Sequence, residues 1–147
     1  MTKSPKQLRI YWLGEDTLEY RIFNLLEDCG AYLVGCDTRL SFYYEPVPEG
    51  GNPVENLAKW MWRMPCNLPT LERMQVTLSH IKAQQADAVI IHSNIGSRDL
   101  PGAERLVRDV IKGETGLPVL SIETSLPGNN IDAVKSQIQD FVTANSR

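Results

Sequence analysis

Short apolar runs alternate with longer segments of helical spacing along this chain, and the alternation predicts its secondary structure. The apolar runs predict strands over residues 8–13, 31–35, 87–91 and 117–122. Apolar residues at intervals of three and four predict helices over residues 15–29, 54–64, 70–81, 103–111 and 131–142. Strands that alternate with helices are typical of an α/β protein, in which helices cover both faces of a mostly parallel sheet.

Residue types at the expected helix ends agree with these boundaries. Glu15 and Asp16 place negative charge at the start of the first helix, where the helix dipole favours it. Gly30 follows that helix, and glycine is the preferred residue just after a helix end. Thr70 is expected to cap the third helix.

The segment between the second strand and the third helix breaks the pattern. It contains Tyr43, Tyr44 and several prolines, so we expect a long irregular and partly helical insertion over residues 36–69. Trp60 and Trp62 stand two positions apart on its helix and cannot share a face, so one of them is expected to face a partner or a covering loop. No repeat or second boundary interrupts the chain, which predicts one doubly wound domain over residues 1–147 with strand order 2-1-3-4.

Composition and charge narrow the function. The net charge is −3, and no run of Lys or Arg forms a basic patch, so we expect no nucleic-acid partner. The longest apolar stretches are strand-sized and no apolar leader stands at the start, so we expect no membrane association and a cytoplasmic location. Three cysteines without CxxC spacing favour free thiols, and we expect neither a metal site nor a cofactor held by this chain alone.

The strand order directs attention to one loop. Ligands of doubly wound sheets bind at the carboxyl ends of the strands where the order reverses, which lies here between the first and third strands. The loop after the third strand carries the candidate ligand-binding residues His92, Ser93, Asn94, Gly96, Ser97 and Arg98. His92 and Ser97 are also the candidate catalytic residues, although the sequence shows no base and orienting group for Ser97.

Each of these residues has an ordinary alternative. A histidine at a strand end often bonds to neighbouring backbone, and Ser93 and Asn94 also favour plain turns. Arg98 is either an anion ligand or half of a solvated pair with Asp99. Cys66, between two prolines, is either an accessible thiol or a small buried hydrophobe. The clustering in one loop, rather than any single residue, makes it the candidate site.

Several motifs occur in a familiar order. They are Arg63-Met64-Pro65-Cys66, Glu72-Arg73, the segment from Ala86 to Asn94, Gly116-Leu117-Pro118-Val119-Leu120 and the closing helix from Ile131 to Val142. In this order they resemble the C-terminal domain of the 2-hydroxyacyl-CoA dehydratase and benzoyl-CoA reductase family, which includes D-components of 2-hydroxyglutaryl-CoA dehydratase. The resemblance covers nearly the whole chain and implies a flavodoxin-like fold.

The resemblance implies further properties. Family members are iron–sulfur subunits of anaerobic metabolism, and their [4Fe-4S] clusters are held by cysteines from two halves. A pattern like H-S-N-x-x-C places one family cluster cysteine at the position of Ser97. Serine is a poor substitute for a thiolate, so the resemblance implies that a cluster lies in a partner subunit. Cys66 matches another family cysteine position, and it stays a candidate that we do not assign as a cluster ligand.

Three functions remain open at this point. The first is a small subunit or accessory domain of a CoA-thioester dehydratase or reductase complex, not catalytic alone, with a larger subunit or further copies as partners. The second is a stand-alone module that binds an acyl-CoA, a nucleotide or another anion. The third is an independent hydrolase or metalloenzyme, for which only His80 and His92 are at hand. Whether the chain is a whole protein or one domain of a longer one stays open.

Overall fold

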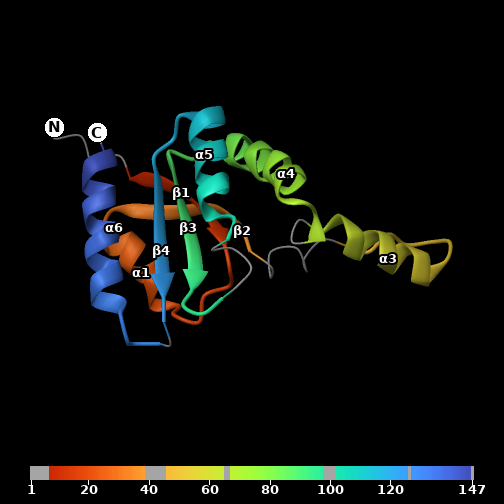
Figure 1. Ribbon diagram of the computed structural model, residues 1–147, viewed down its shortest axis with the longest axis horizontal. Coiled ribbons are helices and arrows are strands. Elements are labelled where there is room, and N and C mark those ends of the chain that lie inside the picture. The colour runs from red at the N-terminus through yellow and green to blue at the C-terminus, as the bar shows by residue number, and fades with distance from the viewer. Residues whose placement is uncertain (1–6, 39–45, 65–66, 98–101, 126, 147) are drawn as a thin grey trace.

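The computed structural model describes residues 7–38, 46–64, 67–97, 102–125 and 127–146. Four strands make one parallel sheet in the order β2-β1-β3-β4, which confirms the predicted order (Figure 1). The strands are β1 (Leu8–Gly14), β2 (Ala31–Asp37), β3 (Ala88–Asn94) and β4 (Val119–Thr124). The helices are α1 (Arg21–Asp28), α3 (Pro53–Arg63), α4 (Thr70–Ala83), α5 (Glu104–Thr115) and α6 (Ile131–Asn145).

Alternation along the strands divides the core into two layers. Even-numbered residues of β1 and β3, such as Trp12 and Ile90, pack against α1 and α6. Odd-numbered residues, such as Leu13 and Ile91, pack against α4 and α5. Because β1 and β3 are central, nearly all their side chains are buried, and this explains their continuous apolar runs.

Several expected boundaries were wrong, and long-range contacts explain two of them. The first helix begins at Arg21, so Glu15 and Asp16 lie in the loop before it rather than at a helix end. The second strand continues to Asp37, beyond the expected end at Gly35. The fourth strand runs from Val119 to Thr124 rather than over 117–122, because it pairs with β3 as far as Asn94. Thr70 is the first residue of α4 and makes no side-chain cap.

The expected insertion over residues 36–69 is partly strand and partly helix. Residues 36 and 37 belong to β2, and α3 spans Pro53–Arg63. The Asn52 side chain accepts hydrogen bonds from the backbone N–H groups of Val54 and Glu55 and so caps α3. Figure 1 shows α3 extending away from the sheet, beyond α4. None of its residues is buried.

Candidate functional site

The loops after β1 and β3 meet at the carboxyl ends of the two central strands, as the strand order predicts. The Glu15 N–H donates to the His92 carbonyl at 3.1 Å, which extends the β1–β3 pairing by one step. At the other side of β3, the Ile95 N–H donates to the Thr124 carbonyl at 2.8 Å. The candidate loop is therefore fixed to both neighbouring strands.

The Glu15 carboxylate is the centre of the hydrogen bonds in this loop. Its Oε2 accepts from the Asn94 backbone N–H at 2.8 Å and from Asn94 Nδ2 at 3.1 Å. Its Oε1 accepts from the Ser97 hydroxyl. Asn94 Nδ2 also donates to the Asp16 carbonyl at 3.0 Å, so the amide holds both residues of the first loop. Three donors of the β3 loop thus converge on one carboxylate.

His92 lies beneath this arrangement and is fully buried. Its Nδ1 is 3.0 Å from the Glu15 carbonyl, which can only accept, so Nδ1 carries the proton. In the neutral ring Nε2 then accepts from the Thr124 hydroxyl, 2.7 Å away. Desolvation lowers the pKa of His92, against the opposing effects of the Glu15 backbone and the nearby carboxylates, so the neutral form is favoured. The Trp12 ring lies over the imidazole with centroids 5.1 Å apart.

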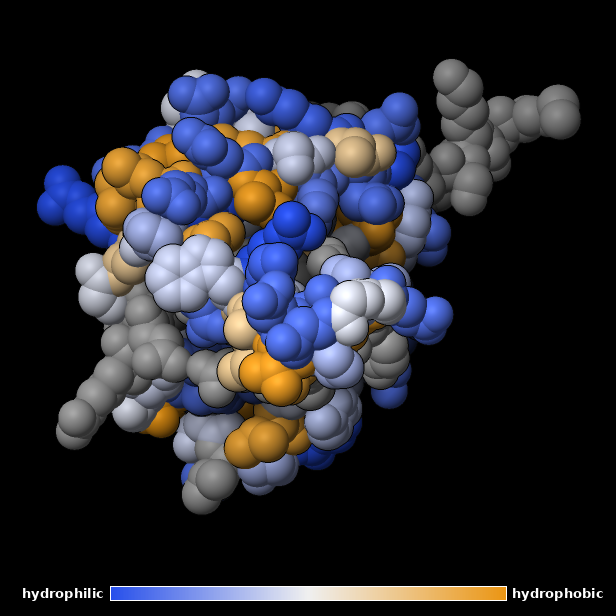
Figure 2. Space-filling view, turned by 90° about the vertical axis from the view of Figure 1, so that its right-hand side faces the viewer, coloured by the Kyte–Doolittle hydropathy of each residue, from blue (hydrophilic) through white to orange (hydrophobic). Residues whose placement is uncertain are grey.

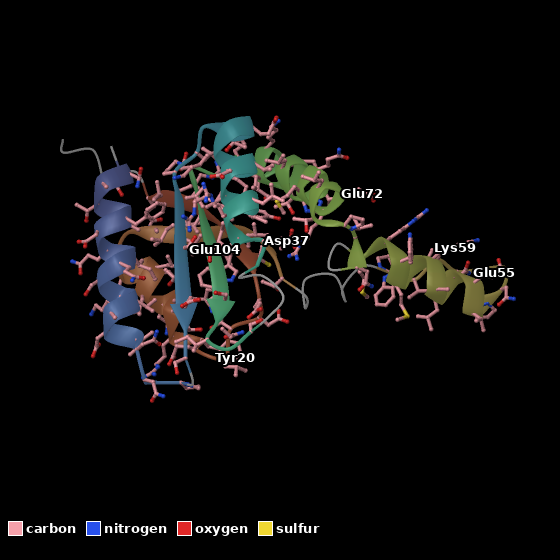
Figure 3. The ribbon with its side chains drawn as sticks, in the orientation of Figure 1. Tyr20, Asp37, Glu55, Lys59, Glu72 and Glu104 are labelled. Carbon is pink, nitrogen blue, oxygen red and sulfur yellow. The ribbon has the colours of Figure 1, made fainter. Side chains whose placement is uncertain are left out.

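Two other buried carboxylates lie near the carboxyl ends of the strands. Asp37, at the end of β2, accepts from Arg73 Nη2 at 3.0 Å and from the Thr77 hydroxyl. Figure 3 shows Asp37 at the end of its strand, beside α4. Glu19 accepts from Arg21 Nε at 2.7 Å and from the Gly128 N–H at 2.8 Å, and so connects the loops before α1 and α6. The Arg21 guanidinium is the main cause that lowers the pKa of Glu19 to about 2.

The predicted site residues are not all brought together. His92, Asn94 and Ser97 share one network with Glu15, whereas Ser93 points to the opposite face of the sheet. The Ser93 hydroxyl is buried and has no hydrogen-bond partner among the described residues. Gly96 is exposed at φ +88°, a conformation that glycine adopts without strain.

Four residues with predicted roles lie outside the described residues, namely Arg98, Cys66, Tyr43 and Tyr44. The roles predicted for these residues stay predictions.

Sequence reasoning missed Glu15 and Thr124 as members of the network. Glu15 was interpreted as a helix-start residue, and Thr124 lay beyond the expected end of its strand. The strand order offered a signal for Glu15, because it placed the loop after β1 next to the loop after β3. No local pattern marks Thr124, whose partners are 30 and 32 residues away in the chain.

Comparison with known families identifies the kind of protein. The family model described as 2-hydroxyglutaryl-CoA dehydratase, D-component, matches residues 1–143. The chain belongs to the 2-hydroxyglutaryl-CoA dehydratase D-component family. The resemblance noted in the sequence is therefore confirmed for the D-component family. No curated protein matches the chain.

The residues described at this loop of the D-component chain do not fit an iron–sulfur cluster. A cluster of this kind is ordinarily held by cysteine thiolates. Ser97, at the position where the resemblance implies a cluster cysteine, has a hydroxyl that already donates to Glu15. Cys29 and Cys36 are partly buried and pack against the core on the α1 side. Within the described ranges, no three His, Cys, Asp or Glu side chains form a group that could hold a metal ion.

One further finding concerns membranes. Among the described residues, no helix combines the length and the apolar character that crossing a bilayer requires.

Proposed function

We propose that the chain acts as a small subunit or accessory domain of a 2-hydroxyacyl-CoA dehydratase-type complex, and that a larger partner subunit holds the iron–sulfur cluster. One observation carries this proposal. Ser97 stands where the family resemblance expects a cluster cysteine, and its hydroxyl is bonded to the Glu15 carboxylate. A hydroxyl that is bonded to a carboxylate is a poor substitute for a thiolate ligand, which supports a cluster held by a partner subunit.

The uncovered helix α3 supports the need for a partner. Val54, Leu57, Met61 and Trp62 are between 46% and 76% exposed on this helix. Figure 2, which views the molecule from the side toward which α3 extends, shows hydrophobic side chains among hydrophilic ones on this face. Isolated helices as short as α3 are marginal in water, so a subunit that covers these side chains would stabilise it. We assign α3 as the contact with the larger subunit.

Co-expression tests the proposal directly. The chain is produced alone and together with the protein encoded by the neighbouring gene, under anaerobic conditions. Size-exclusion chromatography with light scattering is expected to show a complex, and iron analysis is expected to assign the iron to the larger subunit. Iron and sulfide bound stoichiometrically by the chain alone, or stable monomers with no association, would contradict the proposal.

A second function has one observation in its favour. The donors from Asn94 and Ser97 converge on a carboxylate, so the loop has the chemistry to hold the carboxylate or phosphate of an acyl-CoA or nucleotide. In this structure the Glu15 carboxylate takes that place. A stand-alone binding module would therefore have to displace Glu15. Calorimetry with acyl-CoA and nucleotides tests it, and tighter binding to Glu15→Ala than to the unaltered chain is the expected sign.

A further inference from the structure

Among the described residues, no strand pairs with the outer edge of β4. In the sheet order β4 is the last strand. On the β3 side, the carbonyl of Pro118, just before β4, accepts from the Val89 N–H, and the Thr124 carbonyl accepts from the Ile95 N–H. Because the backbone groups of successive strand residues point in opposite directions, the N–H and C=O groups of Val119, Ser121 and Glu123 face away from β3. No helix or strand lies in front of β4 in Figure 1.

A groove follows this edge between the two helix layers. Its volume is about 380 Å³, and its lining includes Ile95, Glu104, Ser121, Glu123, Asn130 and Ala133. Glu104 stands at the start of α5 on one side, as Figure 3 shows, and α6 supplies the other side. The helix layers on both faces of the sheet therefore extend past β4, and the groove lies between them beside the unpaired edge of this strand.

Asn130 shows how this edge accepts a neighbour. Its Nδ2 donates to the Glu123 carbonyl at 2.9 Å, and its Oδ1 accepts from the Ser125 N–H at 3.0 Å. A residue of a parallel strand opposite Thr124 would make the same two hydrogen bonds. Its N–H would donate to the Glu123 carbonyl, and its C=O would accept from the Ser125 N–H. The side-chain amide thus takes the place of one strand residue. The outward backbone groups of Val119 and Ser121 have no partner in the described part of the chain and continue the same register.

The charged side chains that line the groove indicate which kind of segment it can bind. The exposed Glu123 carboxylate has no ion-pair partner in the described part of the chain. Glu104 pairs with Arg108, which also donates to the Ser121 hydroxyl at 2.6 Å. Opposite charges that face each other across two strands stabilise the pairing, and like charges destabilise it. The edge therefore favours a neighbouring strand that carries Lys or Arg opposite Glu123.

We propose that the outer edge of β4 binds an extended segment of a partner protein that carries Lys or Arg, added to the sheet as a fifth, parallel strand. Backbone bonds to Val119, Ser121 and the Glu123 N–H hold the segment. A basic side chain of the segment faces Glu123, and small apolar side chains contact Ile95 and Ala133. This surface does not include α3, and it adjoins the candidate loop at Ile95.

Amide hydrogen exchange and peptide titration test the proposal with the full chain. The probe is a seven-residue blocked peptide in which lysine alternates with valine, and the control peptide has glutamate in place of lysine. Without peptide, the amides of Ser121 and Glu123 are expected to exchange faster than those of Leu120 and Ile122, which face β3. The lysine peptide is expected to slow Ser121 and Glu123 by about tenfold or more and to shift their NMR signals.

A charge-reversed variant makes the test specific. Glu123→Lys is expected to weaken binding of the lysine peptide about tenfold and to strengthen binding of the glutamate peptide. Glu114→Lys, on an exposed part of α5 outside the groove, is expected to leave binding unchanged. Equal binding of both peptides, absence of binding, or signals that shift elsewhere would overturn the proposal. Slow exchange of Ser121 and Glu123 that appears with protein concentration alone would overturn it in favour of a second copy.

Discussion

Glu15 and His92 hold each other through two hydrogen bonds that run in opposite directions. The Glu15 backbone N–H donates to the His92 carbonyl at 3.1 Å, and His92 Nδ1 donates to the Glu15 carbonyl at 3.0 Å. The Glu15 side chain then accepts from Asn94 and Ser97. One residue of the first loop therefore determines both the histidine tautomer and the shape of the candidate loop.

Replacing the Glu15 carboxylate should loosen this loop. In Glu15→Gln the amide oxygen can still accept from Asn94, but the NH₂ group replaces the oxygen that accepts from Ser97, and the negative charge that strengthens all three hydrogen bonds is lost. We expect the free energy of unfolding to fall by about 1–3 kcal/mol in urea denaturation. Glu114→Gln, an exposed change on α5, should shift it by less than about 0.5 kcal/mol. Equal stability of the two variants would show that the carboxylate does not hold the loop.

The environment of His92 predicts a pH dependence. Burial lowers the pKa of His92 in the folded chain below the ordinary value of 6.5, so the unfolded chain binds the proton more tightly. The contribution of His92 to stability is therefore complete above about pH 6.5 and decreases as the pH falls toward the folded pKa. Nitrogen-15 NMR is expected to show a neutral ring with the proton on Nδ1 at neutral pH. In His92→Gln this part of the pH dependence should disappear; a cationic ring at neutral pH would contradict the assignment.

The contribution of Glu19 to the stability of the chain should change at a more acidic pH than that of His92. Its folded pKa of about 2 lies below the ordinary 4.5, because the Arg21 guanidinium and the Gly128 N–H favour the carboxylate. Its stabilising effect is present above about pH 4.5 and is lost as the pH falls toward 2. Denaturation of the unaltered chain and of Glu19→Gln should differ at neutral pH and converge at the acidic end. A constant difference across the range would count against this account.

Two glycines should respond oppositely to the same substitution. A Cβ at Gly35 would lie 3.0 Å from the Tyr11 ring, in the packed layer under α4, so Gly35→Ala should cost about 1–3 kcal/mol. At Gly113, in the last turns of α5, a Cβ would meet nothing within 4 Å. There Gly113→Ala should stabilise the helix by about 0.5–1 kcal/mol. Thermal denaturation of both variants checks the pair, and shifts in the same direction would refute the packing argument.

Substitutions in α3 test the assigned subunit contact. Leu57 on α3 and Leu106 on α5 are both 46% exposed, so they form a matched pair. We expect Leu57→Asp to weaken association with the co-expressed larger subunit about tenfold or more, since a charge would enter an apolar contact. Leu106→Asp should leave association unchanged. If Leu106→Asp has the larger effect, the partner covers α5 instead.

Periodicity was enough to predict the sheet, because buried central strands leave continuous apolar runs that local sequence displays. The ends of β2 and β4 were missed, since Asp37 and Thr124 are polar and read as loop residues. Asp37 can be buried at the end of β2 only because Arg73 and Thr77, far along the chain, provide its partners. The candidate loop was located correctly beside the first loop, but its main acceptor, Glu15, is identified only by contacts that span about 80 residues. Side-chain partners at such separations leave no mark in local spacing.

The isolation of α3 has a consequence for divergence within the family. None of its residues belongs to the core, and its start is capped locally by Asn52. Substitutions on its surface are therefore expected to leave the stability of the sheet unchanged. At the proposed subunit contact, selection could then act on recognition separately from folding, and family members with different partners would be expected to differ most in this helix.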